Sequence, residues 1–300
     1  MEDNIQANCE SAAWRCYASP SRPILRYHGG KWLLATWIIK HFPAHRIYTE
    51  AFGGAASVLL QKPRAYSEIY NDLYGEVVNL FQVLRDAEKA KRLAWQIEMT
   101  PYARQEFERS YDATDDDVEA ARKLIVRSFM GFGTKVAKNA EANGFRGGAK
   151  CLRQSVADEW SKFPANVRTV AGRFTGVVIE QRPALDVLKQ YDTAETLHYV
   201  DPPYPKDSRA DAGDDYAHEL TNDDHREFAR TLHALKGMVI LSGYACDLYD
   251  RELFSDWHRV TRECLADGAR KRVEVLWLNG AARKRFNASS LQPLMFSEEV

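Results

Sequence analysis

Apolar runs of strand length alternate with amphipathic stretches along most of the chain. The runs with strand character span residues 46–52, 65–70, 176–180, 196–200 and 238–242. The clearest stretches of helical period span residues 31–41, 74–85, 222–235 and 247–253. Strands that alternate with helices favour an α/β fold with a doubly wound, mostly parallel sheet. Residues 257–264 and 271–278 are expected to pair as antiparallel strands at one edge.

This alternation is interrupted between the second and third strands. Residues 86–175 have a mainly helical pattern and form a segment too long for a loop. We therefore expect an inserted domain there, with the sheet domain divided into residues 23–85 and 176–300. Residues 1–22 lack periodicity and end in a Pro- and Ser-containing stretch, so they are interpreted as an N-terminal extension.

Composition favours a globular protein that stays in the cytoplasm. The chain of 300 residues is 45% hydrophobic, which is enough for a sizeable core, and no apolar run reaches the roughly 20 residues that span a bilayer. The acidic start does not resemble a signal peptide. The cysteines contain no Cys-x-x-Cys pair, which indicates reduced thiols, no disulfide framework and no metal site: Cys9, Cys16, Cys151, Cys246 and Cys264.

The formal net charge of −1 conceals an asymmetry. Residues 121–175 contain 11 Lys and Arg against 3 Asp and Glu, whereas the remaining residues carry a net charge of −9. A basic segment of this kind is either a solvated surface or the footprint of a nucleic acid. Charge alone leaves both interpretations open.

The ends of the first two predicted strands carry residues typical of a nucleotide site. Residues 52–57 form a small-residue turn around Gly53 and Gly54, which allows a ligand to approach the backbone. Asp72 follows the second strand, where an acidic side chain can accept hydrogen bonds from ribose hydroxyls. No lysine that could bind a phosphate follows the glycine turn, so an adenosine group without phosphates fits better than a triphosphate. The alternative for the glycines is that a tight strand-to-helix turn requires them. The alternative for Asp72 is that it caps the helix that begins near Tyr74.

The most specific signal is the motif Asp201-Pro202-Pro203-Tyr204, directly after an apolar strand. An exocyclic aromatic amine is a poor nucleophile, so a site that methylates it needs hydrogen-bond acceptors. The Asp201 carboxylate and a carbonyl of the proline pair can accept the two amino hydrogens and stabilise the positive charge that develops on nitrogen. Tyr204 can stack on the base, which must first leave the duplex. The alternative is a stiff exit turn made by the two prolines.

Together these motifs resemble the Dam family of DNA adenine methyltransferases, the alpha group. The resemblance covers residues 23–278 and rests on four motifs in the order typical of that group: residues 26–31, residues 50–57, Asp72 and residues 201–204. It implies a Rossmann-like methyltransferase fold that transfers a methyl group from S-adenosylmethionine to adenine N6, without a metal. It also implies that the cofactor is bound by Tyr27, Lys31, Gly53, Gly54, Asp72 and Asp201. Residues 220–228, 241–244 and 270–274 resemble the later strand, helix and DNA-proximal loop of the family.

The resemblance assigns residues 86–175 to a target recognition domain that binds double-stranded DNA. Within it, residues 127–138 join a helical stretch to a glycine-containing loop that suits entry into a groove. The candidate DNA contacts, with side chains extended toward phosphates or bases, are Arg127, Thr134, Lys135 and Lys138, followed by Arg270 and Lys271. The alternative is that the aromatic and Met side chains there pack the core of the insert and the charges are solvated: Phe129, Met130 and Phe132.

Some residues depart from the family pattern. His28 stands where proline or alanine is common, and Ala51 where proline is common. Residues 181–183 read Gln-Arg-Pro where relatives often place an Asp-Phe pair that reads the cofactor adenine. Rival functions are methylation of cytosine N4, RNA adenine or protein glutamine, and a catalytically silent nucleic-acid-binding module. A cognate restriction enzyme is a candidate partner, and we expect a monomer or weak dimer at the nucleoid.

Overall fold

The computed structural model describes residues 18–133, 144–147, 155–208, 219–265 and 271–291. By packing, the chain divides into two compact units. The helical unit comprises Met1–Leu33, Gly54–Gln61 and Tyr74–Ile179, and the sheet unit comprises Leu34–Gly53, Lys62–Leu73 and Glu180–Val300. The sequence placed the segment 74–85 with the sheet, whereas packing groups it with the helices.

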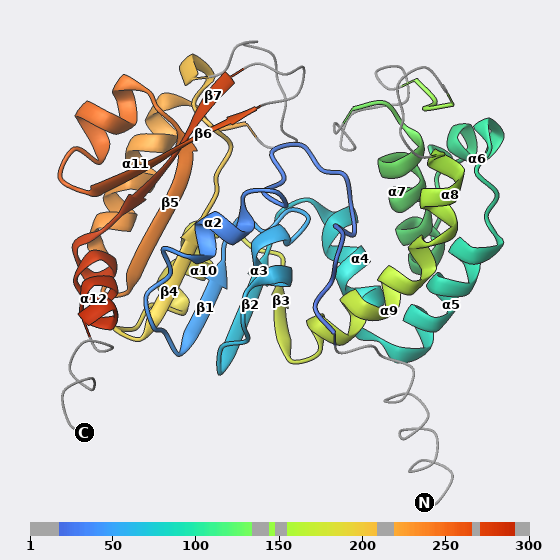
Figure 1. The fold of residues 1–300 in the computed structure, drawn as a ribbon, viewed down its shortest axis with the longest axis horizontal. Helices are drawn as coiled ribbons and strands as arrows, with labels where there is room; N and C mark the ends of the chain where they lie inside the picture. Colours follow the sequence, from blue (N-terminus) through green and yellow to red (C-terminus); the bar gives the residue numbers. More distant parts are fainter. Residues whose placement is uncertain (1–17, 134–143, 148–154, 209–218, 266–270, 292–300) are drawn as a thin grey trace, which may run out of the picture. The chain divides into compact units, whose positions relative to one another are not determined.

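The strands form one seven-stranded sheet with the order β3-β2-β1-β4-β5-β7-β6 (Figure 1). Its strands are β1 (Ile47–Glu50), β2 (Ser67–Asn71), β3 (Val177–Glu180), β4 (Thr196–Val200), β5 (Met238–Tyr244), β6 (His258–Leu265) and β7 (Lys271–Leu278). Strand β1 pairs in parallel with β2 and β4, and β4 pairs in parallel with β5. Strands β5, β7 and β6 pair antiparallel. The expected α/β fold with a mostly parallel, Rossmann-like sheet is confirmed, including its antiparallel edge.

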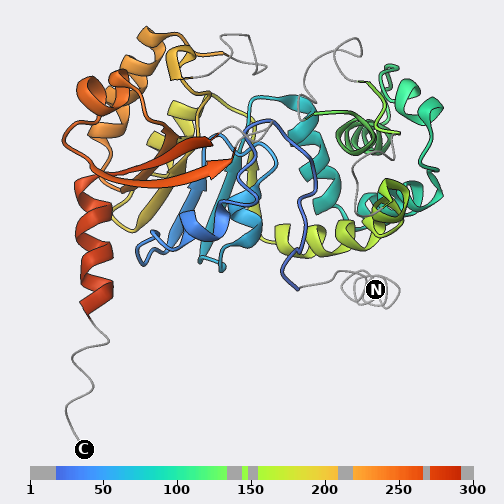
Figure 2. The same ribbon diagram turned by 45° about the horizontal axis from the view of Figure 1, so that its top comes forward.

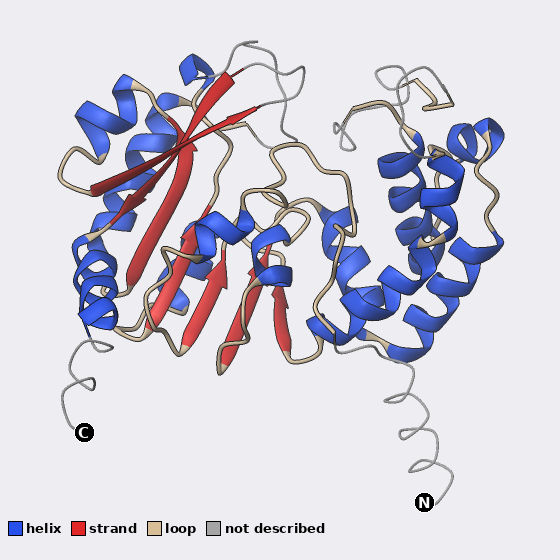
Figure 3. Cartoon of the chain, in the orientation of Figure 1, coloured by secondary structure: helices blue, strands red, loops and turns tan. Residues whose placement is uncertain are grey.

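The helices of the sheet unit lie between or after its strands (Figure 3). They are α2 (Ala35–Ile39), α10 (Ala184–Gln190), η2 (Lys206–Ser208), α11 (Asn222–Ala234), η3 (Leu248–Leu253) and α12 (Gly280–Leu291). Helix α11 begins with a capping box, in which Thr221 and Asp224 each bind the other's backbone N–H. The sequence predicted a helix over residues 31–41, but within this range only α2 is helical, and Leu34 at its amino end provides no capping side chain.

An apolar cluster covers one face of the central strands. Val200 of β4, Leu241 of β5 and Trp277 of β7 pack there against Phe228 of α11 and Tyr249 of η3. Strand β4 is buried along its whole length, which explains its uninterrupted apolar pattern. The carboxyl ends of the central strands therefore stand on well-packed, buried strands.

The helical unit consists of α3 (Ser57–Gln61), α4 (Gly75–Arg85), α5 (Ala87–Met99), α6 (Arg104–Arg109), α7 (Asp117–Met130), α8 (Val156–Ser161) and α9 (Phe163–Phe174). Helices α4, α5, α7 and α9 pack side by side, as Figure 1 and Figure 2 show. The rings of Phe81 and Phe174 stack at 4.2 Å between centroids. The described residues contain no helix long and apolar enough to cross a membrane.

Candidate active site

The turn after β4 carries a chain of polar contacts that starts at Asp201. The Ser242 hydroxyl donates to Asp201 Oδ1 at 2.7 Å, and the Tyr199 and Ser242 hydroxyls lie 3.1 Å apart. The Tyr204 hydroxyl lies 3.1 Å from Asp201 Oδ1 and 2.7 Å from Glu274 Oε1. Three neighbouring strands, β4, β5 and β7, thus supply one polar network around the half-buried Asp201.

Carboxylates dominate the electrostatics of this network. Burial raises the pKa of Tyr199 well above its ordinary value, and the negative charge of Asp201 raises this pKa further. Burial likewise raises the pKa of Tyr48, whose hydroxyl donates to Glu50 Oε1 at 2.7 Å. Carboxylates in a site of low dielectric can accept hydrogen bonds from an amine and stabilise positive charge on it.

The ring of Tyr204 is packed rather than open. Only 3% of the residue is exposed, and its ring meets Tyr244 edge-on at 4.7 Å between centroids. The Arg272 guanidinium lies 4.9 Å from the centroid of the Tyr244 ring. Stacking of Tyr204 on a base stays a prediction, and it requires that the side chains around the ring move.

Asn71, the last residue of β2, bonds to the segments that follow the neighbouring strands β1 and β3. Its side chain donates to the carbonyls of Ala51 at 2.8 Å and Arg182 at 3.0 Å, and it accepts from the Arg182 N–H at 2.9 Å. Its backbone carbonyl accepts from the Gly53 N–H at 2.8 Å. This clamp fixes the glycine turn and the segment before Asp72, which carries the predicted ribose-binding carboxylate.

The two glycines of the turn are required for different reasons. A Cβ atom on Gly53 would lie 2.2 Å from the ring of Tyr70, which is a steric clash. Gly54 has a φ of +46°, in the left-handed region that side chains rarely adopt. The glycine pattern therefore has a structural cause, and its contact with a cofactor stays a prediction.

The amino-terminal cofactor motif folds into a compact loop of the helical unit. The Gly30 N–H donates to the Tyr27 carbonyl at 3.0 Å, and the buried Lys31 ammonium donates to the Gly29 carbonyl at 2.7 Å. The ring of Tyr27 lies where a Cβ atom on Gly54 would approach it to 3.1 Å. Tyr27, Lys31 and Gly54 thus belong to one unit, whereas Gly53, Asp72 and Asp201 belong to the other.

A model of the D12 class N6 adenine-specific DNA methyltransferase family matches residues 27–264. The chain belongs to this family. It is therefore an enzyme that methylates adenine N6 in DNA, and membership implies S-adenosylmethionine as the methyl donor. The resemblance to Dam-like enzymes is confirmed. No curated protein matches the chain. A solved structure similar to it is precorrin 8W decarboxylase from Methanobacterium thermoautotrophicum, with 9% identity, a TM-score of 0.34 and coverage of 82% of this chain and 89% of that one.

The residues of this methyltransferase fit the implied cofactor chemically. A carboxylate such as that of Asp72 has the chemistry that ribose hydroxyls require, and the acidic side chains around Asp201 have the charge that a positively charged sulfonium requires. Among the described residues, no group of three or more His, Cys, Asp and Glu side chains could hold a metal ion.

Of the predicted DNA contacts in the methyltransferase, Arg127 is the one whose side chain is described, and it is not extended. Its guanidinium pairs with Glu76 at 2.7 Å, donates to the Ser110 carbonyl at 3.2 Å and is 11% exposed. This geometry indicates a structural role. Thr134, Lys135, Lys138 and Arg270 lie outside the described residues, and the structure describes only the backbone of Lys271, in β7. Residues 271–274, which the resemblance related to a DNA-proximal loop, lie in β7, and this confirms the strand predicted over residues 271–278.

The alternative interpretation of residues 129–132 holds for two of the three side chains. The Phe129 ring packs on Phe163 at 4.5 Å between centroids, and Met130 is fully buried. Phe132 is 56% exposed. The core alternative thus explains Phe129 and Met130 but not Phe132.

Sequence reasoning missed the side chains that hold Asp201 and Tyr204 in the methyltransferase. Ser242 and Glu274 lie in motifs that the resemblance identified, yet no role was assigned to them. The available signal was a polar residue inside the apolar strand β5 and a carboxylate directly before the apolar run 275–278 of β7. A buried polar group needs a partner, and here the partners are residues of the turn after β4.

Proposed function

We propose that the turn Asp201–Tyr204 binds the amino group of an adenine that has left the duplex. The Asp201 carboxylate accepts one amino hydrogen, and a backbone carbonyl of Pro202 or Pro203 accepts the other. Both acceptors favour the tetrahedral nitrogen that attacks a methyl group. The observation that carries this proposal is the Ser242 hydrogen bond of 2.7 Å, because it orients the Asp201 carboxylate at the end of a buried strand.

S-adenosylmethionine, when bound, supplies an electrophilic methyl group on a sulfonium. We assign its ribose hydroxyls to Asp72, and its remaining contacts to Tyr27, Lys31, Gly53 and Gly54. The Asn71 clamp supports the first assignment, since it holds the backbone directly before Asp72. Lys31 already binds the Gly29 carbonyl, which supports a role in shaping the loop.

DNA recognition is assigned to the inserted helical segment, residues 86–175. Its candidate contacts are Thr134, Lys135 and Lys138, with Arg270 and Lys271 as candidates from the sheet unit. A cognate restriction enzyme, a monomeric or weakly dimeric state and a place at the nucleoid stay predictions from the sequence.

The test is expression of the chain and of Asp201→Ala in a bacterial host that lacks its own adenine methylation. Modified positions are then read across the genome. Methyladenine in one sequence context with the wild-type chain, and none with Asp201→Ala, supports the proposal. Methylation of cytosine, or equal methylation by both proteins, contradicts the role given to this turn.

A further inference from the structure

The Tyr204 hydroxyl has one hydrogen and two neighbouring carboxylates. Its oxygen lies 2.7 Å from Glu274 Oε1 but 3.1 Å from Asp201 Oδ1. Asp201 Oδ1 already accepts the Ser242 hydrogen at 2.7 Å. A hydroxyl bonded to a carboxylate prefers the shorter separation, since charge-assisted O–H···O bonds are the short ones. The distances therefore assign the Tyr204 hydrogen to Glu274.

Glu274 is placed for this contact by the antiparallel edge of the sheet. It lies on β7 directly opposite Tyr244 of β5, and it is 2% exposed. Tyr244 in turn packs on the ring of Tyr204. The two residues of one cross-strand pair thus hold the same side chain, Glu274 by its hydroxyl and Tyr244 by its ring.

A buried carboxylate is costly to keep in a strand that needs only apolar side chains on that face. Leu276 and Leu278, which follow Glu274 on the same face of β7, are buried and apolar. The cost is offset where the carboxylate binds hydrogen-bond donors, and Tyr204 supplies one of them.

We propose that Glu274 is a positioning residue for methyl transfer and acts through the Tyr204 hydroxyl, a role that rests on the proposed function of the Asp201–Tyr204 turn. By accepting from Tyr204, it fixes the last residue of the turn. Because the Tyr204 hydrogen goes to Glu274, Asp201 Oδ1 accepts from Ser242, the nearer hydroxyl, and not from Tyr204. Asp201 then keeps its accepting strength for the amino group of the base.

The experiment is a double-mutant cycle on purified full-length protein. It measures kcat and the KM values for cofactor and DNA in Glu274→Ala, Tyr204→Phe and the double variant. Glu274→Gln is the conservative variant, because its amide oxygen still accepts. Glu263→Ala on the neighbouring strand β6 is the matched control, since Glu263 is exposed.

We expect Glu274→Ala to lower kcat by about tenfold, from the loss of one charge-assisted hydrogen bond, with KM for the cofactor unchanged. Tyr204→Phe is expected to lose a similar factor, and the double variant no more than either alone. Glu274→Gln is expected to retain most of the activity, and Glu263→Ala all of it.

Losses that multiply in the double variant would overturn the proposal, and so would Glu274→Gln as impaired as Glu274→Ala. If Glu274→Ala does not fold, Tyr204→Phe decides, because normal turnover without the hydroxyl leaves Glu274 nothing to act through. None of these results affects the proposed function of the turn. That function fails only if Asp201→Ala retains turnover or if the wild-type chain does not methylate adenine.

Discussion

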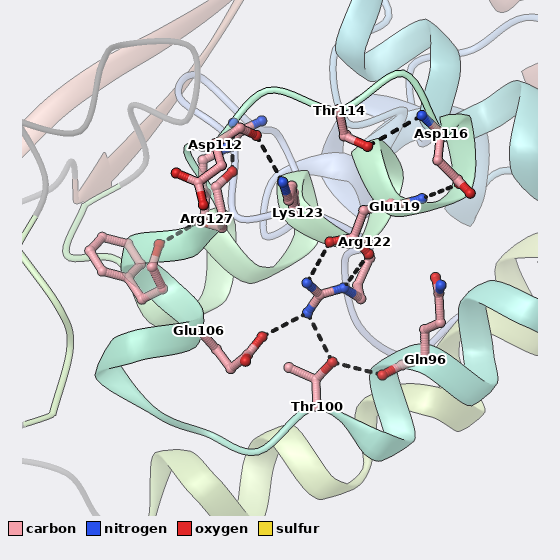
Figure 4. A network of polar contacts seen from close by, with 12 residues as sticks. Gln96, Thr100, Glu106, Asp112, Thr114, Asp116, Glu119, Arg122, Lys123 and Arg127 are labelled. Atoms are coloured by element: carbon pink, nitrogen blue, oxygen red, sulfur yellow. Dashed lines mark hydrogen bonds and ion pairs between the residues drawn. The ribbon is translucent and has the colours of Figure 1, made fainter.

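The site around Asp201 in the sheet unit and the network around Arg122 in the helical unit arrange charged side chains in opposite ways. At the carboxyl ends of the strands, Asp201 and Glu274 gather beside one tyrosine hydroxyl with the same sign of charge. In the helical unit, the Arg122 guanidinium meets carboxylates of opposite charge, Glu119 at 2.7 Å and Glu106 at 3.0 Å (Figure 4). Like charges held together prepare a site for a cation, whereas matched charges hold helices.

The matched charges of the helical unit change how the positive charge of residues 121–175 is interpreted. Residues 121–175 are strongly basic, but the longer predicted insert, residues 86–175, contains 16 Lys and Arg against 13 Asp and Glu. The acids just before residue 121 are the partners of Arg122, and Lys123 donates to the Asp112 carbonyl (Figure 4). Part of the apparent surplus therefore stabilises the unit internally.

Asp201→Ala in the sheet unit is expected to have the largest effect. We expect kcat to fall by about 100-fold or more, since one preorganised acceptor of developing charge is lost. The thermal midpoint should change little, because removing one of several like charges relieves repulsion. Single-turnover kinetics at saturating DNA and cofactor, with a melting curve for each protein, measure both quantities. Near-normal turnover would show that the acidic network is not the reaction site.

Asp72→Ala addresses the cofactor side of the same unit. We expect weaker binding of S-adenosylmethionine by about 1.5 to 3 kcal/mol, from the loss of charge-assisted ribose hydrogen bonds. Asn71→Ala should weaken binding less, because it loosens the clamp without removing the ligand group. Titration calorimetry compares both with Lys31→Ala. Unchanged affinity in all three would mean that these motifs do not bind the cofactor.

A buried histidine of the sheet unit makes its stability depend on pH. His198 Nδ1 lies 2.8 Å from Thr49 Oγ1, and burial lowers the pKa of His198 to about 4, although Asp192 opposes the shift. The folded pKa is below the unfolded value of about 6.5, so the unfolded chain binds the proton more readily. Stability is full above pH 6.5 and decreases as the pH falls toward 4.

Between pH 7 and pH 5 this loss should amount to about 2 kcal/mol. Urea denaturation across that range, on wild type and His198→Gln, measures it. We expect a smaller dependence on pH in His198→Gln. Equal slopes in the two proteins would assign the acid sensitivity to other groups.

The parts that the sequence predicted well depend on residues close together in the chain. The strands, the glycine turn and the Asp201–Tyr204 motif are each read from a few consecutive positions. The bonds that complete the site join residues 41 and 70 positions apart, Ser242 with Asp201 and Glu274 with Tyr204. The ion pair of Arg127 with Glu76 spans 51 positions. Only the register of the strands and the packing of the helices bring such pairs together, and no local pattern encodes either.

Arg122→Ala is the counterpart of Asp201→Ala in the helical unit. The Arg122 side chain is 12% exposed and also donates to Thr100, so its loss leaves Glu106 and Glu119 without this counter-charge. We expect a destabilisation of about 1 to 2 kcal/mol, below the cost of breaking a fully buried pair, with little change in kcat. Arg92→Ala, from the exposed pair with Asp116, should cost less than about 1 kcal/mol. If Arg122→Ala lost much of its kcat while its stability stayed unchanged, the Arg122 network would serve catalysis rather than hold the helices.

Arg127→Met is expected to have the smallest effect of all, on DNA binding. A residue that neutralises one phosphate contributes about −0.9 to the slope of log affinity against log salt, so its removal flattens the slope by about that amount. The Arg127 guanidinium is occupied by Glu76 and by the Ser110 carbonyl, so we expect no change in the slope. Lys135→Met and Lys138→Met are the comparison variants, since both were proposed as DNA contacts. Fluorescence anisotropy over a salt series, on duplexes with and without the methylated sequence, measures all three. If Arg127→Met flattens the slope as much as these variants, its ion pair must open when DNA binds, and part of the matched charge of the helical unit then serves recognition.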